Sequence, residues 1–292
     1  MSTIALLTIT GVGLGALYFL VAAGLSLIWG LMRVLNFAHG AFFTVAAYGG
    51  WVAATAVPGN LWLQWLVGLL VAVLSGALFA TLTEVVLIRP LYARPVGQVL
   101  VTVGLALATV ALVQGGFGND PKTLTLPAWM NATTAVLGAD IPNTRWIVIG
   151  AALLVLGLLL FFLRRTRYGL IVRAGVENRA MVEALGIDVQ RAFTLVFAIG
   201  GAAAGLAGWL AGAYYGTIDP VRGSAMLIFA FIVVVIGGLG SVVGSAIAAV
   251  VVGILQQYLN FYGAAGVGDF AVVLLLAGVL LIRPGGFAGA AA

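Results

Sequence analysis

The chain contains long stretches without a single acidic or basic side chain. These stretches cover residues 1–32, 34–83, 95–119, 146–163, 192–218, 223–268 and 270–282. A membrane-spanning helix needs about 20 mostly apolar residues, because each residue rises ~1.5 Å and the hydrocarbon core is ~30 Å thick. Only 7% of the residues are charged, whereas a soluble domain carries about 25%. Several of the stretches are therefore long enough for one or two membrane-spanning helices each.

The apolar stretches predict helices rather than the strands of a membrane barrel. A transmembrane barrel would show alternating segments of about 10 residues separated by turns, but the apolar runs of this chain are continuous. The 41 glycines fit a helical protein, because small residues let helix backbones approach closely inside a bilayer. We therefore expect residues 1–292 to form a single integral membrane domain, an all-α polytopic membrane protein.

Division at proline, glycine and charged residues indicates nine apolar segments. They lie at roughly 4–30, 40–57, 61–83, 97–116, 146–163, 192–213, 224–237, 242–260 and 264–282. Residues 224–260 form either two spans or one broken, partly re-entrant pair, because a glycine cluster interrupts them. Residues 30–57 have the same ambiguity around residues 36–40. The prediction is eight to ten transmembrane or partly re-entrant helices.

The basic residues predict the orientation of the chain. Six arginines fall within residues 164–191, namely Arg164, Arg165, Arg167, Arg173, Arg179 and Arg191. The positive-inside rule places this stretch in the cytoplasm, together with Arg33, Arg89, Arg94 and Arg283. Lys122, Arg145 and Arg222 are then outside. With nine crossings the N-terminus is outside and the C-terminus inside, and residues 117–145 form an external loop, either an ordered cap or a docking surface. The Gly/Ala-rich tail, residues 284–292, is expected to be disordered.

The composition argues against several kinds of chemistry. The only lysine, Lys122, follows a proline in the external loop, so the chain has no Walker A site for ATP. One histidine and no cysteine make a zinc site improbable. The same histidine, His39, is the only histidine base available to a serine hydrolase, and no serine lies in a motif to pair with it. We expect no catalytic residues, metal or cofactor, and any driving energy must come from another protein.

The arginine-rich stretch also contains a candidate interaction helix. Residues 179–185 predict a short helix in which Asn178 is the N-cap and Gly186 closes the C-terminus. Met181 and Leu185, at positions i and i+4, would form an apolar ridge on it. This helix would fit a socket on a soluble partner. The stretch is equally consistent with an ordinary basic loop that fixes the topology.

Polar residues and glycines mark two possible interruptions of the apolar segments. His39 lies near the inner end of the second segment, where a polar group is a functional candidate, although it could simply bond a neighbouring carbonyl. Asn36 could form an interhelical bond or cap the next helix. Gly237, Gly238 and Gly240 allow either a broken helix that lines a pathway or close helix packing. Glu84 is expected to pair with an arginine of residues 89–94.

The order of these motifs resembles the permeases of branched-chain amino-acid ABC transporters. The resemblance rests on Arg173-Ala174, Glu177-Asn178, ALGI at residues 184–187 and AGLAG at 204–208, which look like the family's coupling segment. It also rests on GLSLIWG at residues 24–30, NFAHG at 36–40, Glu84 with Arg89-Pro90-Leu91, GGLGS at 237–241 and RPGG at 283–286. Gly244 departs from the pattern, because such permeases often have proline there. The chain is most similar to the shorter, first permease subunit.

The resemblance implies a type II ABC-importer-like permease that moves branched-chain amino acids or similar small polar or amide solutes by alternating access. The implied partners are a second permease subunit, two cytoplasmic ATP-binding subunits and a periplasmic or extracellular solute-binding protein, in a bacterial or archaeal cytoplasmic membrane. The implied coupling residues are Arg173, Ala174, Glu177, Asn178, Arg179, Met181, Leu185 and Gly186. The candidates for the pathway or its gate are Asn36, Phe37, His39, Gly237, Gly238 and Gly240.

A secondary transporter or channel that works without ATPases is the alternative interpretation. It would predict acidic residues at the middle of the membrane, coupled to an ion. The eight acidic residues of this chain lie near the ends of the apolar segments or in loops. The charge pattern therefore favours the importer, in which the binding protein sets the specificity.

Overall fold

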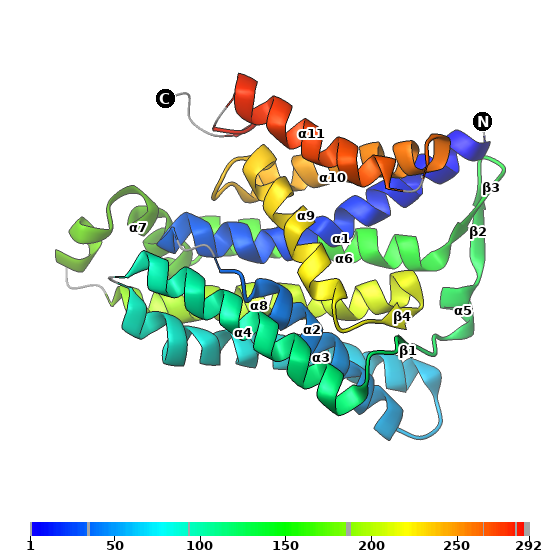
Figure 1. Ribbon diagram of the computed structural model, residues 1–292, viewed down its shortest axis with the longest axis horizontal. Helices are drawn as coiled ribbons and strands as arrows, with labels where there is room; N and C mark the ends of the chain where they lie inside the picture. The colour runs from blue at the N-terminus through cyan, green and yellow to red at the C-terminus, as the bar shows by residue number, and fades with distance from the viewer. Residues whose placement is uncertain are drawn as a thin grey trace.

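The computed structural model describes residues 2–33, 36–92, 94–184, 188–264, 266–283 and 285–288, which form a bundle of helices with a few short strands at one end (Figure 1). The α-helices are α1 (Ser2–Met32), α2 (His39–Ala56), α3 (Leu61–Leu82), α4 (Pro95–Phe117), α5 (Ala128–Asn131), α6 (Asn143–Arg165), α7 (Arg167–Ala184), α8 (Val189–Tyr215), α9 (Arg222–Gly237), α10 (Val242–Tyr262) and α11 (Val267–Ile282). A π-helix, η1 (Thr83–Ile88), and a 3-10 helix, η2 (Arg89–Leu91), follow α3.

The long helices run between two ends of the bundle with different compositions. One end carries α7 and the arginines of residues 164–167, and is called the basic end below. The opposite end carries strands β1 (Lys122–Thr123), β2 (Thr133–Val136), β3 (Ala139–Pro142) and β4 (Thr217–Ile218). The N-terminus lies at the strand end and the C-terminus near the basic end (Figure 1). The two ends therefore differ in charge, and which of them faces the cytoplasm stays a prediction.

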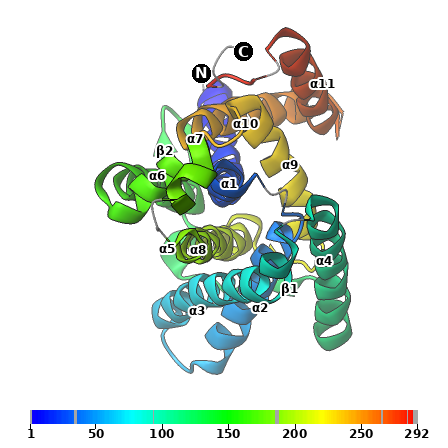
Figure 2. The same ribbon diagram turned by 90° about the vertical axis from the view of Figure 1, so that its left-hand side faces the viewer.

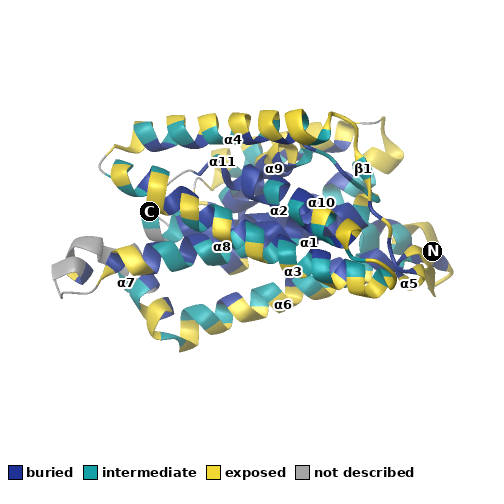
Figure 3. Cartoon of the chain, turned by 90° about the horizontal axis from the view of Figure 1, so that it is seen from below, coloured by how far each residue is buried: buried dark blue, intermediate teal, exposed yellow. Residues whose placement is uncertain are grey.

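Burial divides the helices into a core and a periphery. Helices α1 and α8 lie in the middle of the bundle (Figure 2). In their apolar stretches, 61% of the residues of α1 and 67% of those of α8 are buried. Helices α4 and α6 lie outside, with 22% of their apolar stretches buried, and many of their residues are exposed (Figure 3). Leu107 and Leu112 of α4 are 68% and 76% exposed. Lipid hydrocarbon can solvate such apolar surfaces, whereas water cannot do so favourably.

Among the described residues, six helices are long and apolar enough to cross a membrane, namely α1, α3 with its η1 and η2 extensions, α4, α6, α8 and α10. Two shorter apolar helices, α9 and α11, have 16 residues each, and α2 has 18. The chain is therefore a multi-pass, all-α membrane protein. These six helices establish several crossings, and the total of eight to ten stays a prediction.

The packing between the core helices depends on glycine. A Cβ atom on Gly76 of α3 would lie 2.5 Å from the carbonyl oxygen of Gly201 in α8 and 3.0 Å from the Cα of Gly205. Neither neighbour is a side chain that could rotate away. The close approach of these helices therefore requires glycine, as expected where lipid supplies no hydrophobic drive for helix association.

Both uncertain interruptions are breaks between separate helices. Helix α1 ends at Met32 and α2 begins at His39, while α9 ends at Gly237 and α10 begins at Val242. Gly238 and Gly240 have φ angles of 98° and 87°, which side-chain-bearing residues rarely adopt. Ser241 then caps α10, because its Oγ accepts a 3.0 Å bond from the Gly244 amide. A proline at position 244 would lack that amide hydrogen.

The arginine-rich stretch contains a longer helix than the sequence predicts. Instead of a short helix over residues 179–185, α7 runs without interruption from Arg167 to Ala184. Asn178 is therefore inside the helix, and the prediction that it is the N-cap was wrong. The helix begins earlier because Thr166 accepts a 2.9 Å bond from the Gly169 amide through its hydroxyl, which satisfies a free N–H of the first turn. Leu185 and Gly186 lie outside the described residues.

The described part of the C-terminal tail is attached to the bundle. The sequence predicts a disordered tail after Arg283, but the amides of Phe287 and Ala288 donate bonds of 2.8 and 3.2 Å to the carbonyls of Ile236 and Gly237. Those carbonyls belong to the last turn of α9 and have no partner within their own helix. The tail supplies the missing donors, so the expectation of disorder was wrong for these residues.

The loop of residues 117–145 is ordered by contacts to the bundle. Strands β2 and β3 form a hairpin whose turn contains Leu137 and Gly138, with φ angles of 51° and 77°. Strand β1 pairs with β4 in the connection between α8 and α9. The guanidinium of Arg145 lies 3.4 Å from the ring centroid of Tyr214 and donates a 2.9 Å bond to its carbonyl. The loop therefore forms a cap over the strand end.

Candidate functional site

Helix α7 is the part of the chain that projects farthest at the basic end (Figure 1). Val172 and Val182 of α7 are buried, and Ala174 packs partly against the core. Met181 is 63% exposed. One face of α7 is thus held on the bundle while Met181 stands on another face.

The structure brings most of the predicted coupling residues onto one element. Arg173, Ala174, Glu177, Asn178, Arg179 and Met181 all lie in α7. The side chains of Arg173, Glu177, Asn178 and Arg179 are outside the described part of the structure. Their grouping on a single helix is observed, and their role stays a prediction.

A tight turn fixes the angle at which α7 leaves α6. The Thr166 hydroxyl donates a 2.7 Å bond to the Phe162 carbonyl and accepts the Gly169 amide at 2.9 Å. A Cβ atom on Gly169 would overlap the Phe162 carbonyl oxygen. The turn therefore needs glycine at position 169, and the two helices are joined without a flexible linker.

The entry into α8 is marked by a local ion pair. Asp188 accepts the Arg191 amide at 3.3 Å as the N-cap of α8, and its carboxylate lies 2.9 Å from Arg191 Nε. The two side chains are 52% and 79% exposed. Exposed pairs of this kind contribute little stability, so the main effect of Asp188 is to start the helix.

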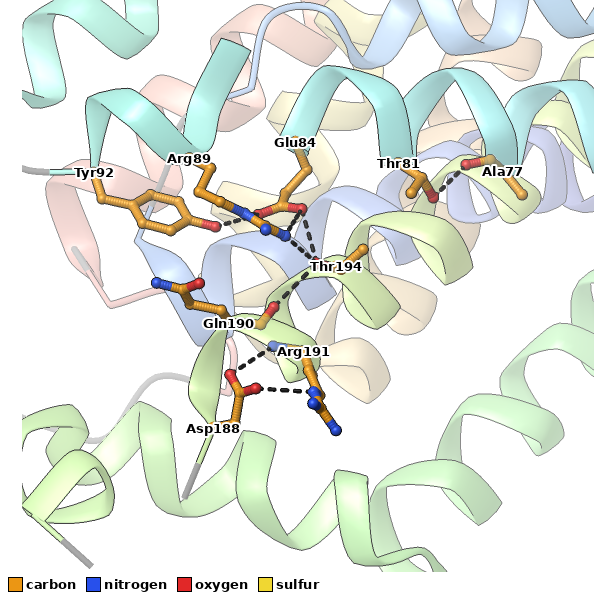
Figure 4. Close-up of polar contacts among 9 residues, drawn as sticks. All are labelled: Ala77, Thr81, Glu84, Arg89, Tyr92, Asp188, Gln190, Arg191 and Thr194. Carbon is orange, nitrogen blue, oxygen red and sulfur yellow. Dashed lines mark hydrogen bonds and ion pairs between the residues drawn. The ribbon is translucent and has the colours of Figure 1, made fainter. Parts of the chain in front are cut away.

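A buried polar network joins α8 to the end of α3 next to this point (Figure 4). Glu84 of η1 is fully buried, and its Oε2 accepts bonds of 2.8 Å from Thr194 Oγ1 and 3.0 Å from Arg89 Nη2. Arg89 Nη2 also donates to Thr194 Oγ1 at 2.8 Å. The Tyr92 hydroxyl donates to the other Glu84 oxygen. A buried carboxylate is tolerated only with such partners.

The network confirms the predicted pairing of Glu84 with Arg89 and adds two partners that sequence reasoning missed. Thr194 is 110 positions from Glu84, and nothing in its local sequence indicates the contact. Tyr92 lies three residues after Arg89, which is a helical spacing, and that spacing was the only available signal. Glu84 lies in a π-helical turn, a feature that occurs frequently at functional sites.

The second group of predicted residues meets at the two helix breaks. A Cβ atom on Gly30, near the end of α1, would lie 3.2 Å from the Cα of Gly240. The ring of Phe37, between α1 and α2, lies 5.3 Å from the ring of Phe231 in α9. The end of α1 therefore lies beside the Gly237–Ser241 connection, while Phe37 of the first break contacts the middle of α9. Phe231 carried no signal in the sequence.

The polar side chains at the first break have local partners. His39 is fully buried, and its Nε2 lies 3.1 Å from the Val21 carbonyl oxygen. Asn36 Oδ1 accepts the Ala38 amide at 3.0 Å, so this oxygen orders the turn before α2. Asn36 Nδ2, His39 Nδ1 and Ser26 Oγ are buried without a hydrogen-bond partner among the described residues. Unpaired buried groups are rare in stable interiors and mark places where a water or a solute is accommodated.

The fold and these sites define an integral membrane protein of the transport class, built from a packed helix core, two helix breaks and a basic projecting helix. Among the described residues no three histidine, aspartate or glutamate side chains group to hold a metal ion. Residues 7–283 match the family model described as "Branched-chain amino acid transport system / permease component". The chain belongs to this family, whose members are transport permease subunits rather than catalytic enzymes.

Named relatives agree with the family match. The chain is 30% identical to the high-affinity branched-chain amino acid transport system permease protein LivH of Escherichia coli (strain K12), over 96% of this chain and 93% of LivH. It is 28% identical to the corresponding protein BraD of Pseudomonas aeruginosa, over 96% and 94%. It is also 28% identical to the fructose import permease protein FruF of Bifidobacterium longum, over 89% and 73%. No solved structure matches the chain.

Proposed function

We propose that the chain is the membrane-spanning permease subunit of an ATP-binding-cassette importer for branched-chain amino acids or similar small polar or amide solutes. The observation that carries the proposal is the similarity, over nearly the whole length, to permeases named for branched-chain amino acid transport. The permease would lie in a bacterial or archaeal cytoplasmic membrane. Its basic end would face the cytoplasm, in agreement with the positive-inside rule.

The assembly would contain a second permease subunit, two cytoplasmic ATP-binding subunits and a periplasmic or extracellular solute-binding protein. The proposal includes a type II importer-like fold with eight to ten crossings. The need for ATP-binding subunits follows from the sequence: the chain has no lysine in a phosphate-binding loop, so ATP hydrolysis must come from other subunits. The ordered external loop, residues 117–145, would then be the surface nearest the binding protein.

Helix α7 would be the element through which the ATP-binding subunits act on the permease. It projects at the basic end, holds six of the eight predicted coupling residues and exposes Met181. The Thr166–Gly169 turn would carry its displacement into α6, and its other end continues toward α8. Because the turn is tight, a force on α7 would rotate these helices rather than bend a linker.

The Glu84 network would extend that motion to α3. Thr194 lies in the first turns of α8, and its bonds to Glu84 and Arg89 attach α8 to the segment that follows α3. Helices α3 and α8 also meet through the Gly76 and Gly201 contact. The two helices would therefore move as one unit when α7 is displaced, which is the rigid-body behaviour that alternating access requires.

The two helix breaks would form the inner part of the translocation pathway. Backbone that is not helical is tolerated at membrane depth only where protein covers it or where it lines a cavity. Phe37 of the first break contacts Phe231 of α9, the helix that ends at the Gly237–Gly240 connection, and Asn36 and His39 carry unpaired polar atoms. The rings of Phe37 and Phe231 would close the pathway between them.

Reconstitution tests the proposed function directly. The chain would be placed in proteoliposomes with its second permease and ATP-binding subunits, and uptake of labelled leucine would be measured with and without the binding protein and ATP. We expect uptake only when all components and ATP are present. Uptake by the chain alone, driven by an ion gradient or by the leucine gradient, would instead establish a secondary transporter or channel.

A further inference from the structure

An apolar groove of about 640 Å³ lies along the outer helix α11 and belongs to none of the sites described above. Its walls are one face of α11, the neighbouring helix α10 and the C-terminal tail, and its lining includes Leu255, Ala271, Leu275, Gly278, Ile282 and Phe287. The tail wall exists because Phe287 and Ala288 are bonded to the end of α9.

The groove ends at a positive charge. Arg283 lines it at the basic end, directly after the last residue of α11. Within the described residues, no hydrogen bond or ion pair is found for its side chain, which is exposed. The groove therefore combines a long apolar wall with a single cation at one end.

The length of the groove matches one leaflet of a bilayer. Ala271 and Ile282 are eleven residues apart along α11, which corresponds to ~16 Å at the helical rise. Half of the ~30 Å hydrocarbon core is about 15 Å. An acyl chain that starts at the level of Arg283 would thus end near the middle of the membrane, close to Ala271.

We propose that this groove holds an acyl chain of an anionic phospholipid from the cytoplasmic leaflet, with the lipid phosphate paired to Arg283. The leaflet follows from the proposed orientation, whereas the pairing follows from the groove itself. Anionic headgroups are the abundant negative charges at that depth, and arginine binds phosphate through parallel hydrogen bonds. The bilayer is as apolar as the groove, so Arg283 sets the selectivity and the groove only fixes the position of the chain.

Native mass spectrometry of the full-length protein in detergent provides the test. The protein is titrated with phosphatidylglycerol and with phosphatidylcholine of the same acyl chains, and bound lipids are counted. We expect one retained phosphatidylglycerol and weaker phosphatidylcholine binding. Arg283→Gln should weaken phosphatidylglycerol binding about five-fold, as expected for the loss of one interfacial charge worth ~1 kcal/mol, and Arg283→Lys should keep most of the preference.

A second variant fills the groove without removing the charge. Gly278 lines the groove, and a Cβ atom there has no heavy atom within 4 Å, so Gly278→Phe should fold and displace the lipid chain. Gly157→Phe on α6 is the matched control, because Gly157 also has open space around it and lies outside the groove. We expect loss of the retained lipid for Gly278→Phe alone.

Three results would overturn the proposal. Equal binding of the two lipids by the wild-type protein would remove the role of Arg283. Unchanged lipid retention by Gly278→Phe would show that lipid does not occupy the groove. Loss of the second permease subunit on purification of Gly278→Phe, with lipid binding intact, would assign the groove to a subunit contact. None of these results depends on transport activity, so the lipid site and the proposed function can fail separately.

Discussion

The hydroxyl of Thr194 donates a 2.8 Å hydrogen bond to Oε2 of Glu84, although the two residues are 110 positions apart in the chain. Thr194 lies near the start of α8, and Glu84 lies in the π-helical turn after α3. Arg89 bonds to both side chains, so the three close a small triangle. The bond therefore ties two core helices together at the end of the bundle that carries α7.

Replacement of Thr194 by valine should lower both stability and coupling. Thr194→Val keeps the shape of the side chain but leaves Glu84 without one donor, and an unsatisfied buried group costs about 1–3 kcal/mol. We expect a lower midpoint of thermal unfolding in detergent and less leucine imported per ATP hydrolysed, with recovery of both in Thr194→Ser. Thr81→Val is the control, since within the described part of the chain the Thr81 hydroxyl bonds only to the Ala77 carbonyl of its own helix. An equal loss of coupling in both variants would contradict the proposed link.

Charge reversal on α7 should separate ATP hydrolysis from transport. Glu177→Lys places a positive charge on the helix that would contact the ATP-binding subunits. A second variant, Gly186→Val, would disturb the segment that follows this helix. We expect normal membrane insertion but several-fold less uptake per ATP in reconstituted vesicles. Asp140→Lys makes the same change in an exposed residue of β3 at the opposite end and should leave the ratio unchanged. Normal transport by both α7 variants would remove the support for α7 as the coupling element.

A methyl group at position 244 should force α9 and α10 apart. A Cβ atom on Gly244 would overlap the carbonyl oxygen of Gly237 and lie 2.9 Å from the Ala288 Cβ. Overpacking of this kind costs about 1–3 kcal/mol, so Gly244→Ala should lower the unfolding midpoint of the purified protein. Gly104→Ala is the matched control, because no heavy atom lies within 4 Å of a Cβ there. If Gly244→Ala is as stable as the control, the two helices are not in close contact.

The absence of cysteine makes the orientation easy to measure. Leu137→Cys places one thiol in the exposed turn of the β2–β3 hairpin, and Tyr168→Cys places one at the start of α7, where the side chain is 44% exposed. A maleimide that cannot cross membranes should label only the Leu137→Cys variant in right-side-out vesicles and both variants after permeabilisation. Labelling of Tyr168→Cys in sealed vesicles would place α7 outside and would exclude the proposed importer mechanism.

Much of the architecture could be predicted from the sequence because lipid imposes a simple rule on the chain. A charge-free run of sufficient length becomes a helix wherever hydrocarbon is the solvent. For this reason the nine apolar segments correspond to α1, α2, α3, α4, α6, α8, α9, α10 and α11. The Glu84 and Arg89 pair was predictable for a related reason, because a buried carboxylate needs a nearby cation and Arg89 is close in sequence.

The details that failed are those that depend on partners distant in the chain. Asn178 is a residue type that favours N-cap positions, but α7 starts at Arg167 and includes it. The buried side chains of Val172 and Val182 hold α7 on the bundle. The glycine-rich tail has no periodic pattern, yet its residues Phe287 and Ala288 are attached to the bundle because the last carbonyls of α9 need donors. The sequence contains no local sign of either relationship.

The sequence by itself determined that this chain crosses a membrane as helices, which segments carry the positive charge, and at which two places a helix could break. Those properties follow from the transfer of each side chain between water and hydrocarbon, which depends on composition and order alone. Only the tertiary structure decided that Thr194 reaches Glu84, that Phe231 meets Phe37, and that the tail and α11 enclose a groove ending at Arg283. These contacts join residues from separate helices, and their geometry is set by how closely glycine-containing surfaces pack.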